Sequence, residues 1–215
     1  MLSYSTQLAH LTYTVGGGYN KIERDDASFD DANGYTAKIA VDYIETGYSW
    51  GGSVVRQLTD SAIGLSGFEM SIANFSASDG NVDEFDIVES TQADLHGSRQ
   101  VGTSSQINGS VGYVLQDYEE TPRDEKTYFA QLGYHYTINT RWSVGLDARY
   151  EDSQFTDDPN DLRQKDKIIN ATLNHQYSER LTSSVVVGRK ERDANVSGRE
   201  YIDNYVMLNA SFRFY

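Results

Sequence analysis

Four histidines are the side chains best able to ligate a metal ion or to transfer a proton: His10, His96, His135 and His175. No two of them stand two or four residues apart, and the chain has no Cys. Zinc sites in proteins draw on closely spaced His and Cys ligands. The spacing therefore favours ordinary structural histidines, and we expect no metal site and no cofactor.

Signs of a catalytic centre are weak. The chain is rich in Ser, but its Gly-x-Ser-x-Gly match, Gly47 to Gly51, stands at the start of an expected strand and not at the strand-to-helix turn of a nucleophile elbow. Asp83, Glu84 and Asp86 form an acidic cluster that could activate water or bind a cation, but a solvated loop end is the commoner explanation. Glycines 16–18 lack the Lys and helix of a phosphate-binding loop and suit a bulge, a bend or close backbone approach in a strand. We expect that the protein is not an enzyme.

Charge excludes one class of partner. The 215 residues contain 18 Lys and Arg against 32 Asp and Glu, which gives a formal net charge of −14. A chain this acidic repels phosphate backbones, so we expect no nucleic-acid partner. No run of about 18 apolar residues is present, which excludes a transmembrane helix. The first residues show no signal peptide, so the signal was removed, the protein stays inside the cell, or the chain is a fragment.

Strict alternation of apolar and polar residues dominates residues 127–155. Trp142, Val144 and Leu146 alternate with Ser143, Gly145 and Asp147. Residues 128–137, which precede them across a short turn, alternate between apolar and polar in the same way. A period of two is the signature of a β-strand with one apolar face. The same pattern recurs at residues 107–115, 169–177, 181–190 and 206–214.

The phase of the alternation predicts which way each side chain points. We expect one face to meet lipid, with Trp142, Val144, Leu146, Val206, Leu208, Ala210, Phe212 and Phe214 on it. We expect the opposite, wet face to line a lumen, with the charged residues Asp147, Arg149, Glu151, Lys190 and Arg213 on it. Charges of both signs there could pair across strands or form a constriction that sorts solutes by charge.

The lengths of the connections alternate as well. Short turns are expected at residues 58–61, 100–103, 138–140 and 178–180, and long acidic loops at 24–34, 76–84, 117–126, 151–167 and 194–199. Short turns at one end and long loops at the other are typical of outer-membrane barrels. We predict an all-β, antiparallel transmembrane β-barrel of about ten strands (about 8–12), formed by residues 1–215 as one domain. The expected strands are 7–23, 46–58, 61–75, 84–98, 102–118, 126–138, 141–154, 165–178, 181–194 and 200–215.

Two details of this scheme stay open. The segment 35–44 also alternates, and either extends the second strand or forms a separate hairpin. Both termini are expected at the short-turn end. Aromatic residues near strand ends, among them Tyr113, Tyr134, Tyr136, Trp142, Tyr150 and Tyr177, suit the aromatic girdles of a membrane barrel or the packing of a soluble β core.

A resemblance to known families rests on several short segments. Residues 205–214 alternate and end in an aromatic residue, which is similar to the outer-membrane assembly signal, with Tyr215 as one extra residue. Residues 104–113, 131–136 and 145–153 each carry an aromatic residue near a strand end. From residue 84 onward the chain resembles β-barrel porin families of Gram-negative outer membranes, most closely barrels associated with exopolysaccharide operons. Family members are usually longer and begin with a signal peptide, so the resemblance implies that the chain is the C-terminal part of a larger barrel.

The resemblance implies a function and partners. We expect an outer-membrane, porin-like barrel for passage of solutes or export of exopolysaccharide, in contact with outer-membrane lipid, lipopolysaccharide and the barrel-assembly machinery, the last through the C-terminal strand. Polysaccharide is a further possible partner. One alternative is a non-conducting barrel that serves as a scaffold or binds through its surface loops. The second is a soluble acidic β-sandwich that binds carbohydrate.

Overall fold

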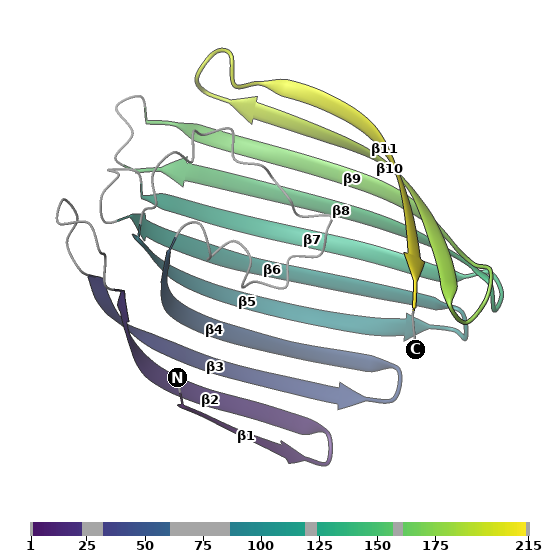
Figure 1. The fold of residues 1–215 in the computed structure, drawn as a ribbon, viewed down its shortest axis with the longest axis horizontal. Helices are drawn as coiled ribbons and strands as arrows, with labels where there is room; N and C mark the ends of the chain where they lie inside the picture. Colours follow the sequence, from purple (N-terminus) through teal and green to yellow (C-terminus); the bar gives the residue numbers. More distant parts are fainter. Residues whose placement is uncertain (1, 23–31, 61–86, 119–123, 157–160, 214–215) are drawn as a thin grey trace.

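Alternating sequence becomes extended strand throughout the part of the chain that the structure describes. A computed structural model describes residues 2–22, 32–60, 87–118, 124–156 and 161–213 (Figure 1). It contains eleven strands in these ranges, each written with its bounds: β1 Leu2–Leu8, β2 Leu11–Ile22, β3 Ala32–Glu45, β4 Tyr48–Asp60, β5 Ile87–Val101, β6 Ser105–Tyr118, β7 Glu125–Thr137, β8 Trp142–Phe155, β9 Arg163–Gln176, β10 Leu181–Ala194 and β11 Tyr201–Phe212.

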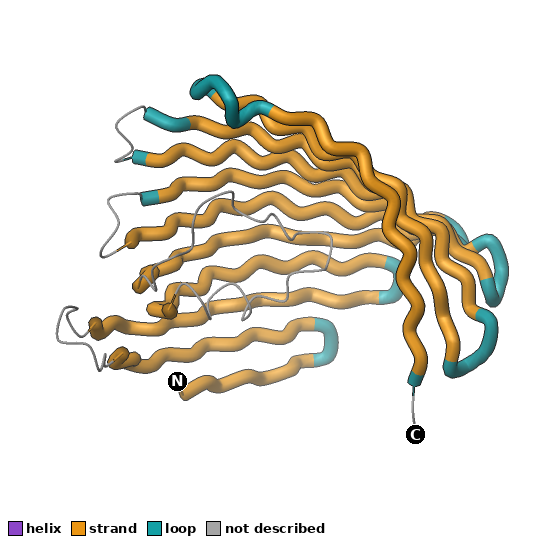
Figure 2. The backbone as a smooth tube through the Cα atoms, turned by 45° about the horizontal axis from the view of Figure 1, so that its top comes forward, coloured by secondary structure: helices purple, strands orange, loops and turns teal. Residues whose placement is uncertain are grey.

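The eleven strands form one continuous antiparallel sheet. Their order in the sheet is their order in the chain, so every strand pairs with the strand before it and the strand after it. Figure 2 shows a single curved layer in which the described segments are strand and turn, with β10 and β11 arching over the rest. This up-and-down order confirms the predicted antiparallel barrel-type fold and contradicts the β-sandwich alternative, which needs two packed layers.

Connections sort by length as predicted. Residues 9–10, 46–47, 102–104, 138–141 and 177–180 make short turns at one end of the sheet, which we call the short-turn end (right in Figure 1). The other connections join strands at the opposite, long-loop end. Because a tight turn at each short connection fixes the register of its hairpin, side-chain direction is set from strand to strand.

Local chemistry explains the short turns. Gly47 and Gly102 adopt positive φ angles of 88° and 70°, which side chains disfavour. In the turn before β8, the side-chain carbonyl of Asn139 accepts hydrogen bonds from the backbone N–H groups of Arg141 and Trp142 at 2.8 and 3.0 Å. In the turn before β10, the Ser178 hydroxyl does the same for Arg180 and Leu181. Both side chains stand in for a backbone partner.

Several predicted boundaries were wrong. The strand expected at 7–23 is two strands, because Ala9 and His10 form a two-residue turn that carries none of the usual Gly or Asn signals. The segment 35–44 lies within β3, a full strand of the sheet that pairs with β2 and β4, so neither open alternative is correct. The short turn expected at 58–61 is absent, because β4 continues to Asp60 in register with Ile87. The strand expected at 61–75 and the acidic cluster at 83–86 lie outside the described residues.

Glycines 16–18 lie inside β2, as a strand reading predicted. They pair without a break in register with Lys38, Ala37 and Thr36 of β3. A strand with regular pairing offers no cradle of free N–H groups for a phosphate.

The two edge strands run in the same direction. Each of β1 and β11 points toward the short-turn end, which corrects the expectation that both termini lie there. The sheet order begins at β1 and ends at β11, and no pairing joins these two strands. A closed antiparallel barrel that contains these eleven strands in this order would therefore hold an odd number of additional strands.

The residues that are buried gather on one face of the sheet. Phe155, Ile168 and Asn170 are among them, and the curved sheet wraps around this side. We call it the inner face and the opposite one the outer face. Alternation along each strand assigns every side chain to one or the other.

Candidate functional site

The outer face is a continuous band of exposed apolar side chains. Leu132, Leu146, Ile169, Val187 and Val206 belong to it, and Leu208 is 78% exposed. Soluble proteins rarely expose contiguous apolar patches larger than a few hundred Å². A surface of this kind, which crosses every strand of the sheet, is suited to hydrocarbon.

Aromatic residues border this band at both ends. At the short-turn end lie Tyr43, Tyr48, Trp50, Tyr134, Tyr136 and Trp142, and at the long-loop end lie Tyr19, Tyr35, Tyr113, Tyr128 and Tyr150. On β8, Trp142 and Tyr150 are eight residues apart, which corresponds to about 26 Å along a strand. A strand tilted by about 45° lowers this height to roughly 19 Å, somewhat less than the apolar band of about 25 Å in membrane barrels.

His175 belongs to the aromatic border at the short-turn end. Its ring stacks on Trp142 with centroids 4.0 Å apart, and Tyr177 meets it edge-on at the same distance. His175 lies on the same face of β9 as the apolar residues Ala171 and Leu173, at the end of the strand where a membrane interface is expected. Its two aromatic neighbours give it a packing role there.

Glu45, at the tip of the β3–β4 hairpin, is hydrogen-bonded by two tyrosines of the same aromatic border. The hydroxyls of Tyr48 and Tyr43 donate to Glu45 Oε2 at 2.5 and 2.8 Å. These two hydrogen bonds, the one from Tyr48 first, hold the pKa of the Glu45 carboxyl below its ordinary value. Two girdle tyrosines are thereby oriented toward the polar side of the border.

The inner face carries polar residues in two neighbouring rows, each crossing all eleven strands. The first row consists of Gln7, Thr12, Asp42, Gly51, His96, Ser110, Gln131, Arg149, Ile168, Lys190 and Asp203. The second consists of Ser5, Thr14, Ala40, Ser53, Asp94, Gly112, Phe129, Glu151, Asp166, Arg192 and Tyr201. We call these two rows the inner belt.

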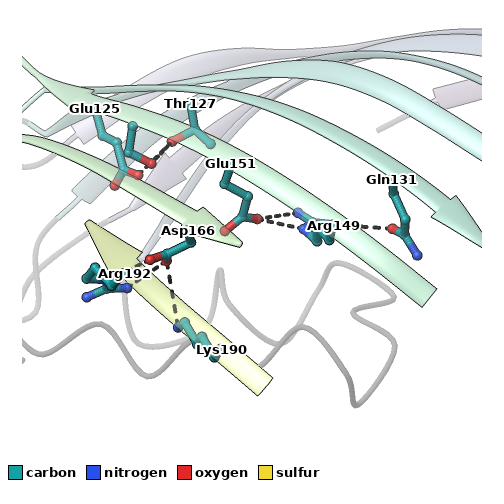
Figure 3. A network of polar contacts seen from close by, with 9 residues as sticks. Glu125, Thr127, Gln131, Arg149, Glu151, Asp166, Lys190 and Arg192 are labelled. Atoms are coloured by element: carbon teal, nitrogen blue, oxygen red, sulfur yellow. Dashed lines mark hydrogen bonds and ion pairs between the residues drawn. The ribbon is translucent and has the colours of Figure 1, made fainter. Parts of the chain in front are cut away.

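Arg149 and Glu151 form one ion pair of the belt, as Figure 3 shows. The guanidinium donates to Glu151 Oε1 through Nε at 2.7 Å and lies 2.6 Å from it through Nη2. The Arg149 group also stands 4.9 Å from the centre of the Phe129 ring and reaches Gln131 Oε1 at 3.4 Å. The cation is therefore fixed in place on both sides rather than mobile.

Asp166 holds a second pair. Arg192 donates to both of its carboxylate oxygens at 2.8 Å, and Lys190 Nζ lies 3.7 Å away (Figure 3). Asp166 and Arg192 side chains are each only 8% exposed. Tyr201 of β11 lies under the cations, with the Arg192 guanidinium 5.1 Å from its ring centre. A two-pronged contact of this kind is strong and geometrically specific.

A third cluster bridges three strands. His96 Nδ1 lies 2.9 Å from Asp94 Oδ2, and His96 Nε2 lies 3.0 Å from Asp42 Oδ1 on β3. The Ser53 hydroxyl donates to Asp94 at 2.5 Å. Gly51 makes the bridge possible, because a Cβ at that position would stand 2.3 Å from Asp42 Oδ1. The two carboxylates contact opposite ring nitrogens, so they do not converge on one ion.

Two kinds of feature were not found among the described residues, a metal-binding cluster and a membrane-spanning helix. Within residues 2–22, 32–60, 87–118, 124–156 and 161–213, no three His, Asp or Glu side chains are arranged to hold a metal ion. Nor does that part of the chain contain a helix of the length and apolarity needed to span a membrane.

The structure places the predicted site residues on the two faces as follows. Asp147, Arg149, Glu151 and Lys190 lie on the inner face. Trp142, Val144, Leu146, Val206, Leu208, Ala210 and Phe212 lie on the outer face. Arg213 follows β11, is exposed, and donates its backbone N–H to the Arg180 carbonyl. Phe214 lies outside the described residues.

Sequence reasoning missed several members of the inner belt. Asp42, Asp94 and His96 were not connected, and neither Asp166 nor Arg192 was included. Arg192 shares the parity of the predicted charge Lys190, and the others occupy the polar parity of their own strands, so alternation carried a signal for them. Their contacts depend on which strands pair, and in which register.

Solved structures similar to this chain are outer-membrane proteins. An OmpT of Vibrio cholerae lacking its loop L8 superposes with a TM-score of 0.67 at 9% identity, covering 98% of this chain and 61% of that one. OmpT expressed in the outer membrane gives 0.63 at 10% identity, with 98% and 63% covered. Its trimer form gives 0.60 at 10% identity, with 97% and 61% covered. This chain thus spans about three-fifths of the length of these proteins.

Comparisons of sequence alone found nothing. No family model matches the chain. No curated protein matches it either. Because the sequence identity is so low, the structural likeness is evidence for the fold alone. The strands have the arrangement of a bacterial outer-membrane β-barrel, as predicted.

Proposed function

We propose that the eleven strands form part of the wall of a porin-like barrel in the outer membrane, through which polar solutes pass. The observation that carries the proposal is the two-faced sheet: exposed apolar side chains on the outer face and the polar inner belt on the other. Only a closed wall satisfies every backbone group in lipid. Eleven strands already exceed the eight whose side chains fill a barrel interior.

Asp147, Arg149, Glu151, Lys190 and Arg213 line the lumen in this proposal. Val206, Leu208, Ala210, Phe212, Phe214, Trp142, Val144 and Leu146 face lipid, and the C-terminal strand engages the assembly machinery. The outer face contacts membrane lipid and lipopolysaccharide. In this proposal the protein's role is transport rather than catalysis. The resemblance to exopolysaccharide-associated barrels adds polysaccharide to the solutes that it would transport.

A second candidate is a barrel that does not conduct. The observation in its favour is the depth of the Asp166–Arg192 pair, whose side chains are 8% exposed and fixed by two hydrogen bonds. Paired charges that project into the lumen occupy space through which solutes would otherwise pass. Such a barrel would serve as a scaffold or bind through its loops.

Ion selectivity tests the pore. On the inner face, the described strands carry the carboxylates Asp42, Asp94, Glu125, Asp147, Glu151, Asp166 and Asp203, against the basic residues Lys38, Arg149, Lys190 and Arg192. We expect the protein refolded in planar bilayers to conduct and to prefer K⁺ over Cl⁻ at low salt, with the preference falling at about 1 M as charges are screened.

Charge variants of one strand sharpen the measurement. Arg149→Gln removes an inner cation and should raise the preference for K⁺, whereas Asp147→Asn should lower it. Arg189→Gln removes a cation from the outer face of β10 and serves as the control, with no expected change. A folded barrel without conductance would support the non-conducting candidate instead.

A further inference from the structure

A patch of the inner face near the short-turn end carries no charge. It consists of Thr137, Ser143, Asn174, Gln176, Thr182, Ser184, Asn209 and Ser211, which we call the polar patch. These residues line an open cavity of about 430 Å³ over β7 to β11. This volume lies within the roughly 300–1,000 Å³ of small-molecule sites.

Regular pairing creates the patch. Ser143, Asn174, Ser184 and Asn209 stand opposite one another on four consecutive strands, so hydroxyls and amides alternate across the sheet. The Asn174 amide donates to Ser143 Oγ and the Asn209 amide donates to Ser184 Oγ, both at 3.3 Å. Each bond uses one N–H of an amide that has two donors and a carbonyl oxygen. The orientation of both amides is thereby set, and hydrogen-bonding capacity remains for a ligand.

The chemistry of the lining selects one class of ligand. Most small-molecule sites are predominantly apolar, but this cavity offers hydroxyls and carboxamides from five strands. Such groups donate and accept in equal measure, which matches a molecule with many hydroxyls. Arg141 at the turn is the only Lys or Arg in the described lining, and no Asp or Glu belongs to it.

The surroundings disfavour an anionic ligand. The chain has a formal net charge of −14, and carboxylates outnumber basic groups on the inner face of the described strands. A negative potential over a concave wall repels anions. A neutral polyhydroxylated ligand meets no such barrier.

We propose that the polar patch binds neutral sugar units of a glycan at the short-turn mouth of the barrel. The proposal relies on the proposed function only in placing the patch within a pore.

Calorimetric titration of the refolded protein in micelles tests the site directly. We expect maltotriose to produce a saturable heat of binding, and trigalacturonic acid to bind at least about threefold more weakly. Asn174→Leu and Asn209→Leu should each weaken maltotriose binding by about 3- to 10-fold, as expected for the loss of one or two hydrogen bonds.

A matched control removes a hydroxyl elsewhere on the same face. Thr14→Val deletes the hydroxyl that bonds Ser5 on β1 and should leave binding unchanged. If an Asn variant does not fold, as judged by heat-modifiable gel mobility, Ser184→Ala and Ser211→Ala replace it with smaller changes. Absence of a saturable response, or tighter binding of trigalacturonic acid that Arg141→Gln abolishes, would overturn the proposal.

Conductance separates this site from the proposed function. Sugar binding by a protein that does not conduct would support the site and contradict the pore. A conducting protein that does not bind maltotriose would contradict the site and leave the pore in place.

Discussion

An arginine in place of Val187 should prevent most of the protein from folding into lipid vesicles, whereas the same change at Val186 should have little effect. Val187 lies on the outer face level with Ala171 and Val206, and it is 53% exposed. An Arg that faces the bilayer midplane costs about 2–4 kcal/mol in membrane barrels. At about 1.4 kcal/mol per factor of ten, the folding equilibrium would fall by roughly 30- to 700-fold.

Val186 is the control that the sequence supplies. It stands next to Val187 and opposite Thr172 and Met207, on the inner face. An Arg there points toward the polar side, and we expect a change below about 1 kcal/mol. Urea titration of both variants in phospholipid vesicles, followed by heat-modifiable mobility, measures the difference. A larger loss for Val186→Arg than for Val187→Arg would mean that the faces are assigned the wrong way round.

Loss of the Asp166 carboxylate should destabilise the folded barrel by about 3–5 kcal/mol. Asp166→Asn keeps the shape of the side chain but leaves Arg192 and Lys190 without this carboxylate, at a place where the Arg192 side chain is 8% exposed. Removing one partner of a buried ion pair takes away most of what offsets the desolvation of the other charge. The free energy of unfolding in urea, measured in vesicles, gives the size of the effect.

Two further variants decide whether the cause is the buried charge. Glu191→Gln breaks an exposed ion cluster with Lys167 and Arg189, on the outer face of β9 and β10, and should cost no more than about 1 kcal/mol. Combining Asp166→Leu with Arg192→Met removes both charges and should recover most of the lost stability. Equal effects from Asp166→Asn and Glu191→Gln would rule out a special role for the buried pair.

The strands were predictable where one face alternates without interruption. Residues 181–194 were predicted as a strand and form β10, and the strand predicted at 141–154 forms β8 within one residue. The prediction failed at Ala9 and His10, because these residues lack turn chemistry and Ala9 is in phase with the alternating Leu11, Tyr13 and Val15. It failed again at residues 58–61, where a polar Thr-Asp-Ser run suggested a turn and the strand continues to Asp60.

The inner belt was predictable only within strands. Arg149 and Glu151 are two residues apart on β8, so their common face follows from alternation alone. Asp42 and His96 are 54 residues apart, and they meet because β3, β4 and β5 pair in one particular register with Gly51 between them. Asp166 and Arg192 likewise depend on the β9–β10 register. Register across long connections is a property of the whole sheet, and one sequence does not reveal it.

Spin labels along β11 test most directly whether the outer face meets lipid and the inner face meets water. The chain has no Cys, so a single Cys introduced at each of positions 205–212 carries the only label. We predict that collision rates with oxygen, which dissolves in lipid, peak at Val206, Leu208 and Ala210, and that rates with a water-soluble nickel complex peak at Tyr205, Met207 and Asn209. Collision profiles without a period of two, or with the two phases exchanged, would contradict the account.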